Sequence, residues 1–336
     1  MQYLYALTSA PKDNYYEQFL LSVFSLKRIM PNASVILLCD LNTKKNLTGN
    51  RGEYEKFVSG VVTADVPASF SQIEVSRWIK TSMRRLVKGD FLFIDFDTII
   101  TGDLSSISEL GITFGACLDK HLPINKHDKK EQIISNDKSL GFSSYTSNMH
   151  YNSGVIYCAD TPETQKIFER WHELWLFCKS KKIIRDQPSF NAAIHENQSF
   201  FTELDGKWNC QAAYNGLPYL SDSKIIHYFA TDMTMNELPY LLAKDNIFNQ
   251  IKNNGIIPED TVKLLENPRS AFVSNVKIVA GSDMLYVLNS NLFQSIYLLK
   301  RKAPLLFNFF NGISTFIKKI TKLFITKSGK NKKYYN

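Results

Sequence analysis

The chain has 336 residues, of which 44% are hydrophobic, enough for one large domain or two smaller ones with a packed core. Its net charge is +8, but residues 300–336 hold ten Lys or Arg and no acid, so removing those ten leaves −2 for the rest. Five widely spaced cysteines without a CxxC motif argue against a disulfide framework or a zinc site. No apolar stretch reaches the roughly 18 residues of a membrane-spanning helix.

Strand and helix patterns alternate along the first half of the chain. Short apolar runs predict strands, and apolar residues at helical spacing predict helices. We expect strands at 3–8, 35–39, 58–63 and 91–94, helices at 15–30 and 74–87, and later strands at 112–118 and 154–158. This alternation predicts an α/β fold with a mostly parallel sheet flanked by helices.

Residues 120–150 interrupt this alternation. The segment 120–130 is polar and aperiodic, and a long loop of this kind in a compact domain is typical of a lid, a binding loop or a disordered segment. Thr161 and Pro162 then mark the start of a helix over 163–179, because Pro favours the first helical position.

The most informative segment is Phe91–Asp97. Four apolar residues lead into Asp95 and Asp97, as expected for a buried strand with two carboxylates at its end. Ligands of α/β sheets bind at the carboxyl ends of strands, and hard cations such as Mg²⁺ and Mn²⁺ take carboxylate and phosphate oxygens. The segment predicts a metal-bridged phosphate site, and the alternative is that both Asp are ordinary turn residues.

Four downstream segments complete a pattern with this strand. They are Tyr151-Asn152-Ser153-Gly154-Val155, Arg185-Asp186-Gln187-Pro188-Ser189-Phe190-Asn191, Trp208-Asn209 and Ile225-Ile226-His227-Tyr228. Their order and spacing, with Arg77 on an upstream helix, resemble glycosyltransferase family 8, which includes bacterial lipopolysaccharide galactosyl- and glucosyltransferases and glycogenin. The resemblance spans residues 3–230 and implies the GT-A fold, with a Rossmann-like sheet that binds a nucleotide-sugar.

The resemblance also implies a role for each matching residue. The ligands of a Mn²⁺ or Mg²⁺ ion would be Asp95, Asp97 and His227. The residues that hold the donor sugar would be Arg77, Asn152, Asp186 and Gln187. The nucleotide-binding residues would be Thr8, Asp40, Asp95 and Phe96. Transfer in this family retains the anomeric configuration, with the leaving phosphate accepting the acceptor's proton, and the catalytic groups that stabilise an oxocarbenium-like centre would be Asp186 and Gln187.

Simpler interpretations of several of these residues remain open. His227 follows two isoleucines and could be a hydrogen-bonded core histidine. Arg77 could pair with Glu74 on its own helix, and Asn152 and Gln187 could be turn residues.

One element departs from the family pattern. The family's His-x-x-Gly-x-x-Lys-Pro-Trp run would begin at His227, but the sequence here is His227-Tyr228-Phe229-Ala230-Thr231-Asp232-Met233. The Gly and Lys that approach the diphosphate are missing. We therefore expect diphosphate binding to differ here, or another cation, such as Lys224 or one within 234–280, to serve instead.

The C-terminal segment 300–336 combines basic charge with an amphipathic pattern. The apolar residues at helical spacing are Ile313, Phe316, Ile317, Ile320, Leu323 and Phe324. They predict a helix lying on an anionic membrane surface. The alternatives are packing on the catalytic domain and a nucleic-acid-binding tail, and no nucleic-acid partner is expected because no aromatic–basic groove motif occurs. Since no secretory signal is recognisable either, we expect a cytoplasmic protein, peripheral on the inner face of the membrane.

These motifs predict a metal-dependent retaining glycosyltransferase. It would move a hexose from a nucleotide-sugar, expected to be a UDP-sugar, to a glycan or lipid-linked glycan in cell-surface polysaccharide or lipopolysaccharide synthesis. We expect the catalytic domain at 1–232, its helical C-terminal part at 233–299 and the membrane-association tail at 300–336. The alternatives are a haloacid-dehalogenase-like phosphohydrolase, whose nucleophile strand also ends in Asp-x-Asp, and a non-catalytic membrane-associated scaffold with a transferase fold.

Overall fold

The computed structural model describes residues 1–229, 240–272 and 290–328. The chain divides into two compact units, 1–273 and 274–336. This division falls between the boundaries predicted at 232 and 300, which remain predictions.

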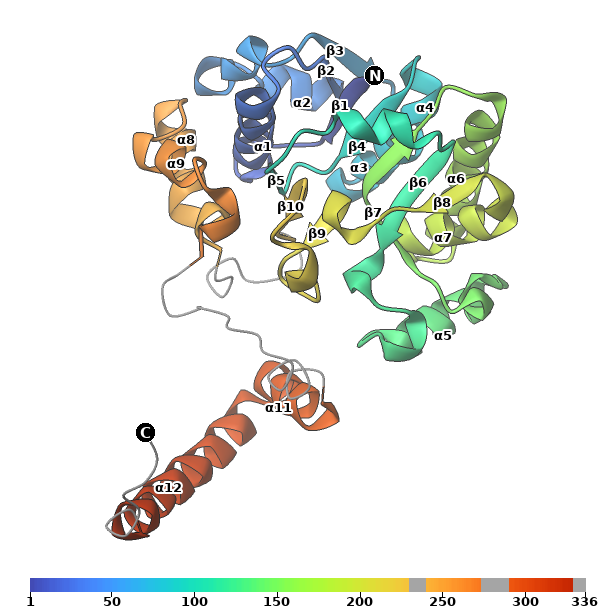
Figure 1. Ribbon diagram of the computed structural model, residues 1–336. Coiled ribbons are helices and arrows are strands. Elements are labelled where there is room, and N and C mark those ends of the chain that lie inside the picture. The colour runs from blue at the N-terminus through green and yellow to red at the C-terminus, as the bar shows by residue number, and fades with distance from the viewer. Residues whose placement is uncertain (230–239, 273–289, 329–336) are drawn as a thin grey trace. The chain divides into compact units, whose positions relative to one another are not determined.

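The first unit is built on a seven-stranded sheet (Figure 1). Its strands in spatial order are β3 (Gly60–Ala64), β2 (Val35–Asp40), β1 (Gln2–Leu7), β4 (Phe91–Ile94), β7 (Tyr151–Cys158), β6 (Phe114–Leu118) and β8 (Phe201–Glu203). Strand β7 is antiparallel to its neighbours β4 and β6, and the other neighbouring pairs are parallel. The predicted α/β fold with a mostly parallel sheet is confirmed.

A smaller three-stranded sheet carries the predicted histidine. Its strands in order are β5 (Thr98–Ile100), β10 (Ile225–His227) and β9 (Cys210–Gln211). Strand β5 begins directly after Asp97, and β10 pairs with it antiparallel so that His227 lies opposite Thr98. This register brings residue 227 beside the end of β4, although about 130 residues of chain separate the two segments.

Helices cover both faces of the main sheet. The helices of the first unit, not all of which lie on the sheet, are in chain order α1 (Tyr15–Ile29), α2 (Leu41–Asn46), α3 (Gln72–Thr81), α4 (Met83–Leu86), α5 (Lys130–Leu140), α6 (Pro162–Ser180), α7 (Gln187–Glu196), α8 (Asp245–Asn254) and α9 (Glu259–Leu264). Side chains alternate between the faces of a strand. From β4, Leu92 and Ile94 therefore join the core beneath α1, whereas Phe91 and Phe93 join the core beneath α3, α6 and α7.

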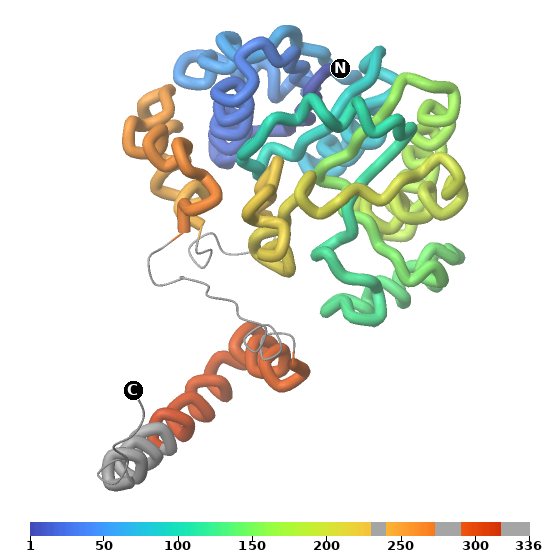
Figure 2. Tube along the Cα trace, viewed as in Figure 1, coloured from blue at the N-terminus to red at the C-terminus, as the bar shows by residue number. Residues whose placement is uncertain are grey.

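The pairing of β4 with β7 joins the two halves of the unit. Figure 2 shows the blue and cyan chain up to β4 lying against the green chain that contains β7. The carboxyl end of β4 therefore meets the amino-terminal part of β7, where Asn152 and Ser153 lie.

The structure corrects three predicted elements. Strand 154–158 begins at Tyr151. The helix predicted over 74–87 ends at Thr81, whose Oγ1 hydrogen-bonds the Arg77 carbonyl, and the short α4 follows. The loop predicted over 120–150 contains helix α5. Its buried face carries Asp137 between two apolar residues, so the apolar spacing that marks a helix is incomplete.

The second unit holds two described helices, α11 (Asn291–Lys302) and α12 (Pro304–Ser328). Large apolar side chains on both are exposed, among them Phe293 on α11 and Leu305, Phe309 and Phe316 on α12. The side chains of Ile317, Ile320, Leu323 and Phe324, part of the predicted apolar stripe, lie outside the described residues. No helix within the described ranges is both long enough and apolar enough to cross a bilayer.

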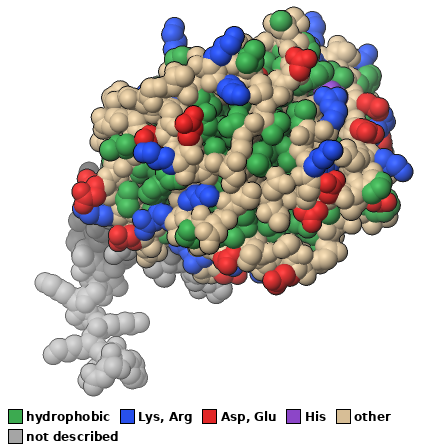
Figure 3. Space-filling view, turned by 90° about the horizontal axis from the view of Figure 1, so that it is seen from above, with side chains coloured by type: hydrophobic (Ala, Val, Ile, Leu, Met, Phe, Trp, Pro, Cys, Tyr) green, Lys and Arg blue, Asp and Glu red, His purple; other side chains and the backbone are tan. Residues whose placement is uncertain are grey.

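Charges of both signs are spread over the surface of the first unit. Figure 3 shows Lys and Arg interspersed with Asp and Glu on one face of the molecule. This agrees with the charge of −2 that the sequence leaves when its basic C-terminal segment is set aside.

Candidate active site

Three side chains that can bind a divalent cation meet at the carboxyl ends of β4 and β10. Single ligand atoms of Asp95, Asp97 and His227 all lie within 4.8 Å of one another. His227 Nε2 lies 3.2 Å from an oxygen of Asp97, and the residues are buried or partly buried. Two carboxylates and one imidazole nitrogen are a donor set that fits a divalent cation.

A chain of amides fixes the orientation of the His227 ring. Its Nδ1 lies 3.0 Å from Asn209 Oδ1, and because an amide oxygen can only accept, Nδ1 carries a proton. Asn209 donates in turn to Asn152 Oδ1 at 3.0 Å, and Asn152 donates to an oxygen of Asp119 at 2.8 Å. The other ring nitrogen, Nε2, therefore faces Asp97, and this kind of support is common behind metal-binding histidines.

Gly154 allows β7 to pack closely against these residues. A Cβ atom at this position would clash with His227 Cε1 and would lie 2.8 Å from Asn152 Oδ1. The Gly154 carbonyl also accepts a hydrogen bond from the backbone N–H of Asp95 at 2.7 Å. The glycine of the Asn-Ser-Gly segment is therefore required by close packing beside the metal ligands.

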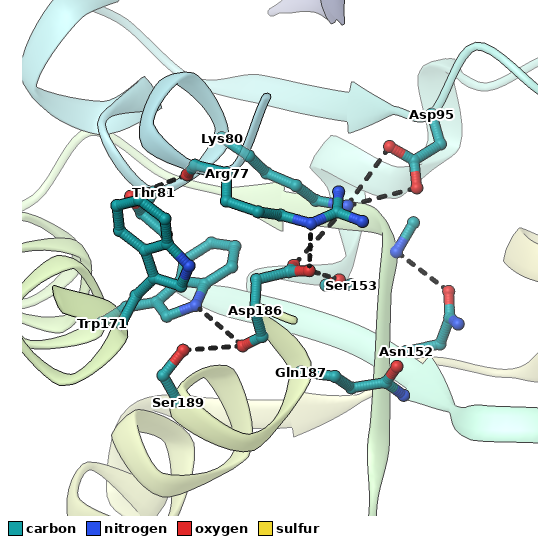
Figure 4. A network of polar contacts seen from close by, with 12 residues as sticks. Arg77, Lys80, Thr81, Asp95, Asn152, Ser153, Trp171, Asp186, Gln187 and Ser189 are labelled. Carbon is teal, nitrogen blue, oxygen red and sulfur yellow. Dashed lines mark hydrogen bonds and ion pairs between the residues drawn. The ribbon is translucent and has the colours of Figure 1, made fainter. Parts of the chain in front are cut away.

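A second buried carboxylate, Asp186, lies on the other side of the cleft at the N-terminus of α7. Its Oδ1 is 3.0 Å from Arg77 Nε, and its Oδ2 accepts a hydrogen bond from Ser153 Oγ at 2.8 Å. Figure 4 shows that Arg77 reaches Asp186 from α3 while Trp171 and Ser189 bond the Asp186 carbonyl. Arg77 thus pairs with Asp186. The alternative interpretation, in which Arg77 pairs with Glu74 on its own helix, is wrong.

Lys80 connects the two sides. Its Nζ is 3.2 Å from each carboxylate oxygen of Asp95 and 3.9 Å from Asp186 Oδ2. Figure 4 shows the ammonium group between the two carboxylates. Lys80 lies one turn after Arg77, so α3 directs two cations into the cleft.

The pKa values of Asp95 and Asp186 are shifted in opposite directions. Burial raises the pKa of Asp95 above its ordinary value, and the nearby Asp97 raises it further, despite the opposing effect of Lys80. Burial acts in the same direction on Asp186, but Arg77, Lys80 and Ser153 together lower the pKa of that carboxyl below its ordinary value. The pKa of His227 is raised, because Asp97 and Asp95 outweigh the effect of burial.

Most of the predicted site residues line one cleft with a volume of about 560 Å³. These are Thr8, Arg77, Asp95, Phe96, Asp97, Asn152, Asp186, Gln187 and His227. Gln187 donates a hydrogen bond to the Tyr151 carbonyl at 3.3 Å. Asn152 both donates and accepts within the amide chain, so it supports His227 in addition to lining the cleft.

Two residues named in the sequence analysis are not part of this lining. Asp40 caps α2 by accepting hydrogen bonds from the N–H groups of Asn42 and Thr43. Lys224, suggested as a replacement cation for the diphosphate, does not line the cleft. Of the other suggested positions, 234–239 and 273–280 lie outside the described residues.

Residues 89–232 match the profile of the family described as glycosyl transferase family 8. This part of the chain is similar to family 8 glycosyltransferases. This confirms the resemblance inferred from the motifs and the class of enzyme, a glycosyltransferase, in place of the phosphohydrolase alternative. No curated protein matches the chain.

Several solved structures are similar to this chain. The chain is similar to the apo structure of the bifunctional glycosyltransferase WbbM, with a TM-score of 0.51 and 15% identity, over 80% of this chain and 52% of that one. It thus spans about half the length of WbbM. Galactosyltransferase LgtC with donor and acceptor sugar analogs (TM-score 0.48, 13% identity, 78% of this chain and 99% of that one) is also similar. So is apo mouse xyloside xylosyltransferase 1 (TM-score 0.46, 12% identity, 69% and 99%).

The sequence motifs that resemble family 8 did not reveal Lys80 or the role of Asn209. Lys80 follows Arg77 at a spacing of three residues on a predicted helix, which is the only signal that it faces the cleft. Asn209 belonged to a quoted segment, but its contact with His227 depends on β9 and β10 being neighbours.

Proposed function

We propose that this chain is a metal-dependent retaining glycosyltransferase that moves a hexose from a nucleotide-sugar, a UDP-sugar, to a glycan or lipid-linked glycan. The observation that carries the proposal is the convergence of Asp95, Asp97 and His227 in one cleft with the Arg77–Asp186 pair. A divalent cation, Mn²⁺ or Mg²⁺, held by the first three residues would stabilise the leaving diphosphate as a Lewis acid.

The protein's own groups contribute binding and orientation. Asn209 holds the His227 ring so that Nε2 faces Asp97, and Gly154 leaves room for that ring. Arg77 keeps Asp186 ionised and fixed, so its negative charge is available to a donor sugar that develops positive charge as its bond to the diphosphate breaks. The buried carboxylate needs no reorganisation at that moment.

The base and sugar of the donor can be tested together by a thermal-shift screen. We expect a UDP-sugar with Mn²⁺ to raise the melting temperature, because a ligand present at a hundred times its Kd stabilises the fold by about 2.7 kcal/mol. The matched control is Asp97→Asn, which should lose the metal-dependent part of the shift. The proposal would be refuted if no nucleotide-sugar shifts the melting temperature with either Mn²⁺ or Mg²⁺.

Donor hydrolysis separates an active transferase from a non-catalytic scaffold. Many transferases release sugar slowly to water when no acceptor is present, so we expect UDP to form from the donor only when the divalent cation is added. Binding without any release, with or without candidate acceptors, would favour the scaffold.

We also propose that residues 300–336 hold the enzyme on the inner face of the membrane. Support comes from the ten Lys or Arg without an acid and from exposed apolar side chains on α12, such as Leu305, Phe309 and Phe316. A basic residue near an anionic bilayer contributes about 1 kcal/mol. A lipid-linked acceptor at the cytoplasmic face would then lie within reach of the enzyme.

Vesicle flotation tests this membrane role directly. The full chain should float with vesicles that contain anionic phosphatidylglycerol and much less with neutral phosphatidylcholine vesicles. A chain ending at residue 299 should stay at the bottom of the gradient with both. Equal flotation of the two chains would reject the proposal.

A further inference from the structure

The amino group of Lys80 is a buried cation in the middle of the cleft. Only 5% of its side chain is exposed, and its Nζ contacts both oxygens of Asp95 at 3.2 Å. The same atom lies 5.0 Å from the centre of the Phe93 ring, which is favourable for a cation over an aromatic face. The ammonium group therefore packs on the Phe93 ring of β4, and its other partners are the carboxylates of Asp95 and Asp186.

Asp95 is also a proposed metal ligand, so Lys80 cannot be explained only as the counter-ion of this carboxylate. A metal cation bound by Asp95 would take one or both of the oxygens that Lys80 contacts. The ammonium group and the metal also have the same sign of charge, and they repel each other strongly in a partly buried site. Binding of the metal therefore competes with the contact between Lys80 and Asp95.

The cleft must also supply a cation to a diphosphate, because the lysine of the family's histidine element is missing. Four cationic side chains line the cleft among the described residues: Arg77, Lys80, Lys182 and Arg185. Arg77 forms an ion pair with Asp186, and Lys182 and Arg185 are exposed residues. Lys80 is the buried one of the four, and a buried ammonium group interacts with a phosphate more strongly than one that is screened by water.

Lys80 also has a suitable position along the donor. It lies between Asp95, a predicted metal ligand, and Asp186, a predicted sugar-holding residue. In a nucleotide-sugar the diphosphate links the nucleoside to the sugar, so the phosphate next to the sugar lies between the groups that bind metal and sugar. A lysine at this place can donate hydrogen bonds to phosphate oxygens.

We propose that Lys80 exchanges partners during donor binding. In the free chain its ammonium group neutralises Asp95, and when the cation and the donor bind it moves from Asp95 to the diphosphate, replacing the missing family lysine. This inference rests on the proposed function. It makes Lys80 a diphosphate-binding residue that also limits metal binding before the donor arrives.

The exchange predicts effects of opposite sign on two affinities. Replacing Lys80 with Met keeps most of the side-chain volume and removes the charge. We expect Lys80→Met to bind Mn²⁺ alone about tenfold more tightly, because no ammonium group competes for Asp95. We expect it to bind UDP in the presence of saturating Mn²⁺ about tenfold or more weakly, as is typical when a charged hydrogen bond is lost.

Both affinities can be measured without turnover. Isothermal titration calorimetry with Mn²⁺ alone, and then with UDP or inorganic pyrophosphate at saturating Mn²⁺, gives the two constants for each full-length variant. Lys88→Met is the matched control, because Lys88 is an exposed lysine before the amino end of β4, opposite the end that carries Asp95. It should leave both constants unchanged. Lys80→Arg should retain diphosphate binding better than Lys80→Met does.

The outcomes distinguish this inference from the proposed function. If wild type binds UDP with Mn²⁺ and Lys80→Met binds it equally well, the exchange is wrong and the proposed function stands. If Lys80→Met weakens Mn²⁺ and UDP binding together, Lys80 is only a structural support of Asp95, and the exchange is again wrong. If wild type binds neither UDP nor pyrophosphate with Mn²⁺, both the proposed function and the exchange are wrong.

Discussion

The carboxylates on the two sides of the cleft, Asp95 and Asp186, have different surroundings. Asp186 has a dedicated partner, because Arg77 contacts it and Ser153 donates to it, and its pKa is lowered. Asp95 is contacted by Lys80 and lies beside the second negative charge of Asp97, and burial raises its pKa. On the sugar side of the cleft, Arg77 and Ser153 already balance the charge of Asp186 in the folded chain. On the metal side, Asp95 and Asp97 bring two negative charges together, which a divalent cation can neutralise.

The largest effect should follow from removing a metal ligand. Asp97→Asn should reduce transfer at least about a thousandfold, because a metal contributes several kcal/mol to stabilising the leaving group and about 1.4 kcal/mol corresponds to a factor of ten. Mn²⁺ binding measured by calorimetry should be lost as well, while circular dichroism remains that of the wild type. Full activity in this variant would contradict the metal-side assignment.

Asp186→Asn should separate the two sides. The variant keeps the size of the side chain but removes the charge that faces the sugar, so we expect kcat/KM to fall about a hundredfold. Its affinity for Mn²⁺ alone should stay within about twofold of wild type, because Asp186 is not one of the three clustered ligands. A parallel loss of Mn²⁺ affinity would mean that the two sides act as one unit.

The positions of several site residues could be predicted from the sequence, because these residues lie at the ends of recognisable strands. The apolar run of β4 leading into Asp95 and Asp97 fixes the location of two carboxylates, and the later segments follow in a recognisable order. The placement of His227 required the pairing of β10 with β5, which local patterns do not encode. Only the resemblance connected it to the two carboxylates.

The features that the sequence did not predict, the role of Lys80 and helix α5, both involve polar residues in buried positions. Lys80 on α3 and Asp137 on α5 both occupy helix faces that turn inward, where sequence patterns lead one to expect apolar residues. Each is tolerated because it has a partner in the folded chain, Asp95 for Lys80 and Ser144 for Asp137. Such pairs depend on tertiary contacts and cannot be recognised from the spacing of residues in one segment.

The support behind the metal side can be tested with Asn209. Asn209→Ala removes the acceptor that fixes the His227 ring and leaves Asn152 without one of its donors. We expect Mn²⁺ affinity to fall about tenfold, at the lower end of the range for such supporting residues. Thr43→Ala, which alters a buried side chain around α2 instead, is the control for a general loss of packing and should leave Mn²⁺ affinity unchanged.

The smallest expected effect is a difference in stability, and it tests whether the pKa values of Asp95 and Asp186 are shifted in opposite directions. In the metal-free chain at pH 7, Asp95→Asn should raise the melting temperature by about 2 °C and Asp186→Asn should lower it by about as much. Ionised Asp95 costs stability because its pKa is raised in the fold, so the amide removes that cost. Ionised Asp186 adds stability because its pKa is lowered, and the amide loses that contribution.

The pH dependence of these two shifts should also differ. The cost of ionised Asp95 disappears as the pH falls through its raised folded pKa toward the ordinary value, so the gain in Asp95→Asn should vanish first. The contribution of Asp186 is fully present above its ordinary pKa and is lost only as the pH falls through the lowered folded pKa, so that difference should persist to more acidic conditions. Differential scanning fluorimetry in EDTA between pH 7 and pH 4 measures both. Shifts of the same sign at pH 7 would mean that the fold holds the two carboxylates alike, because only an unequal balance of burial and nearby cations gives them opposite signs.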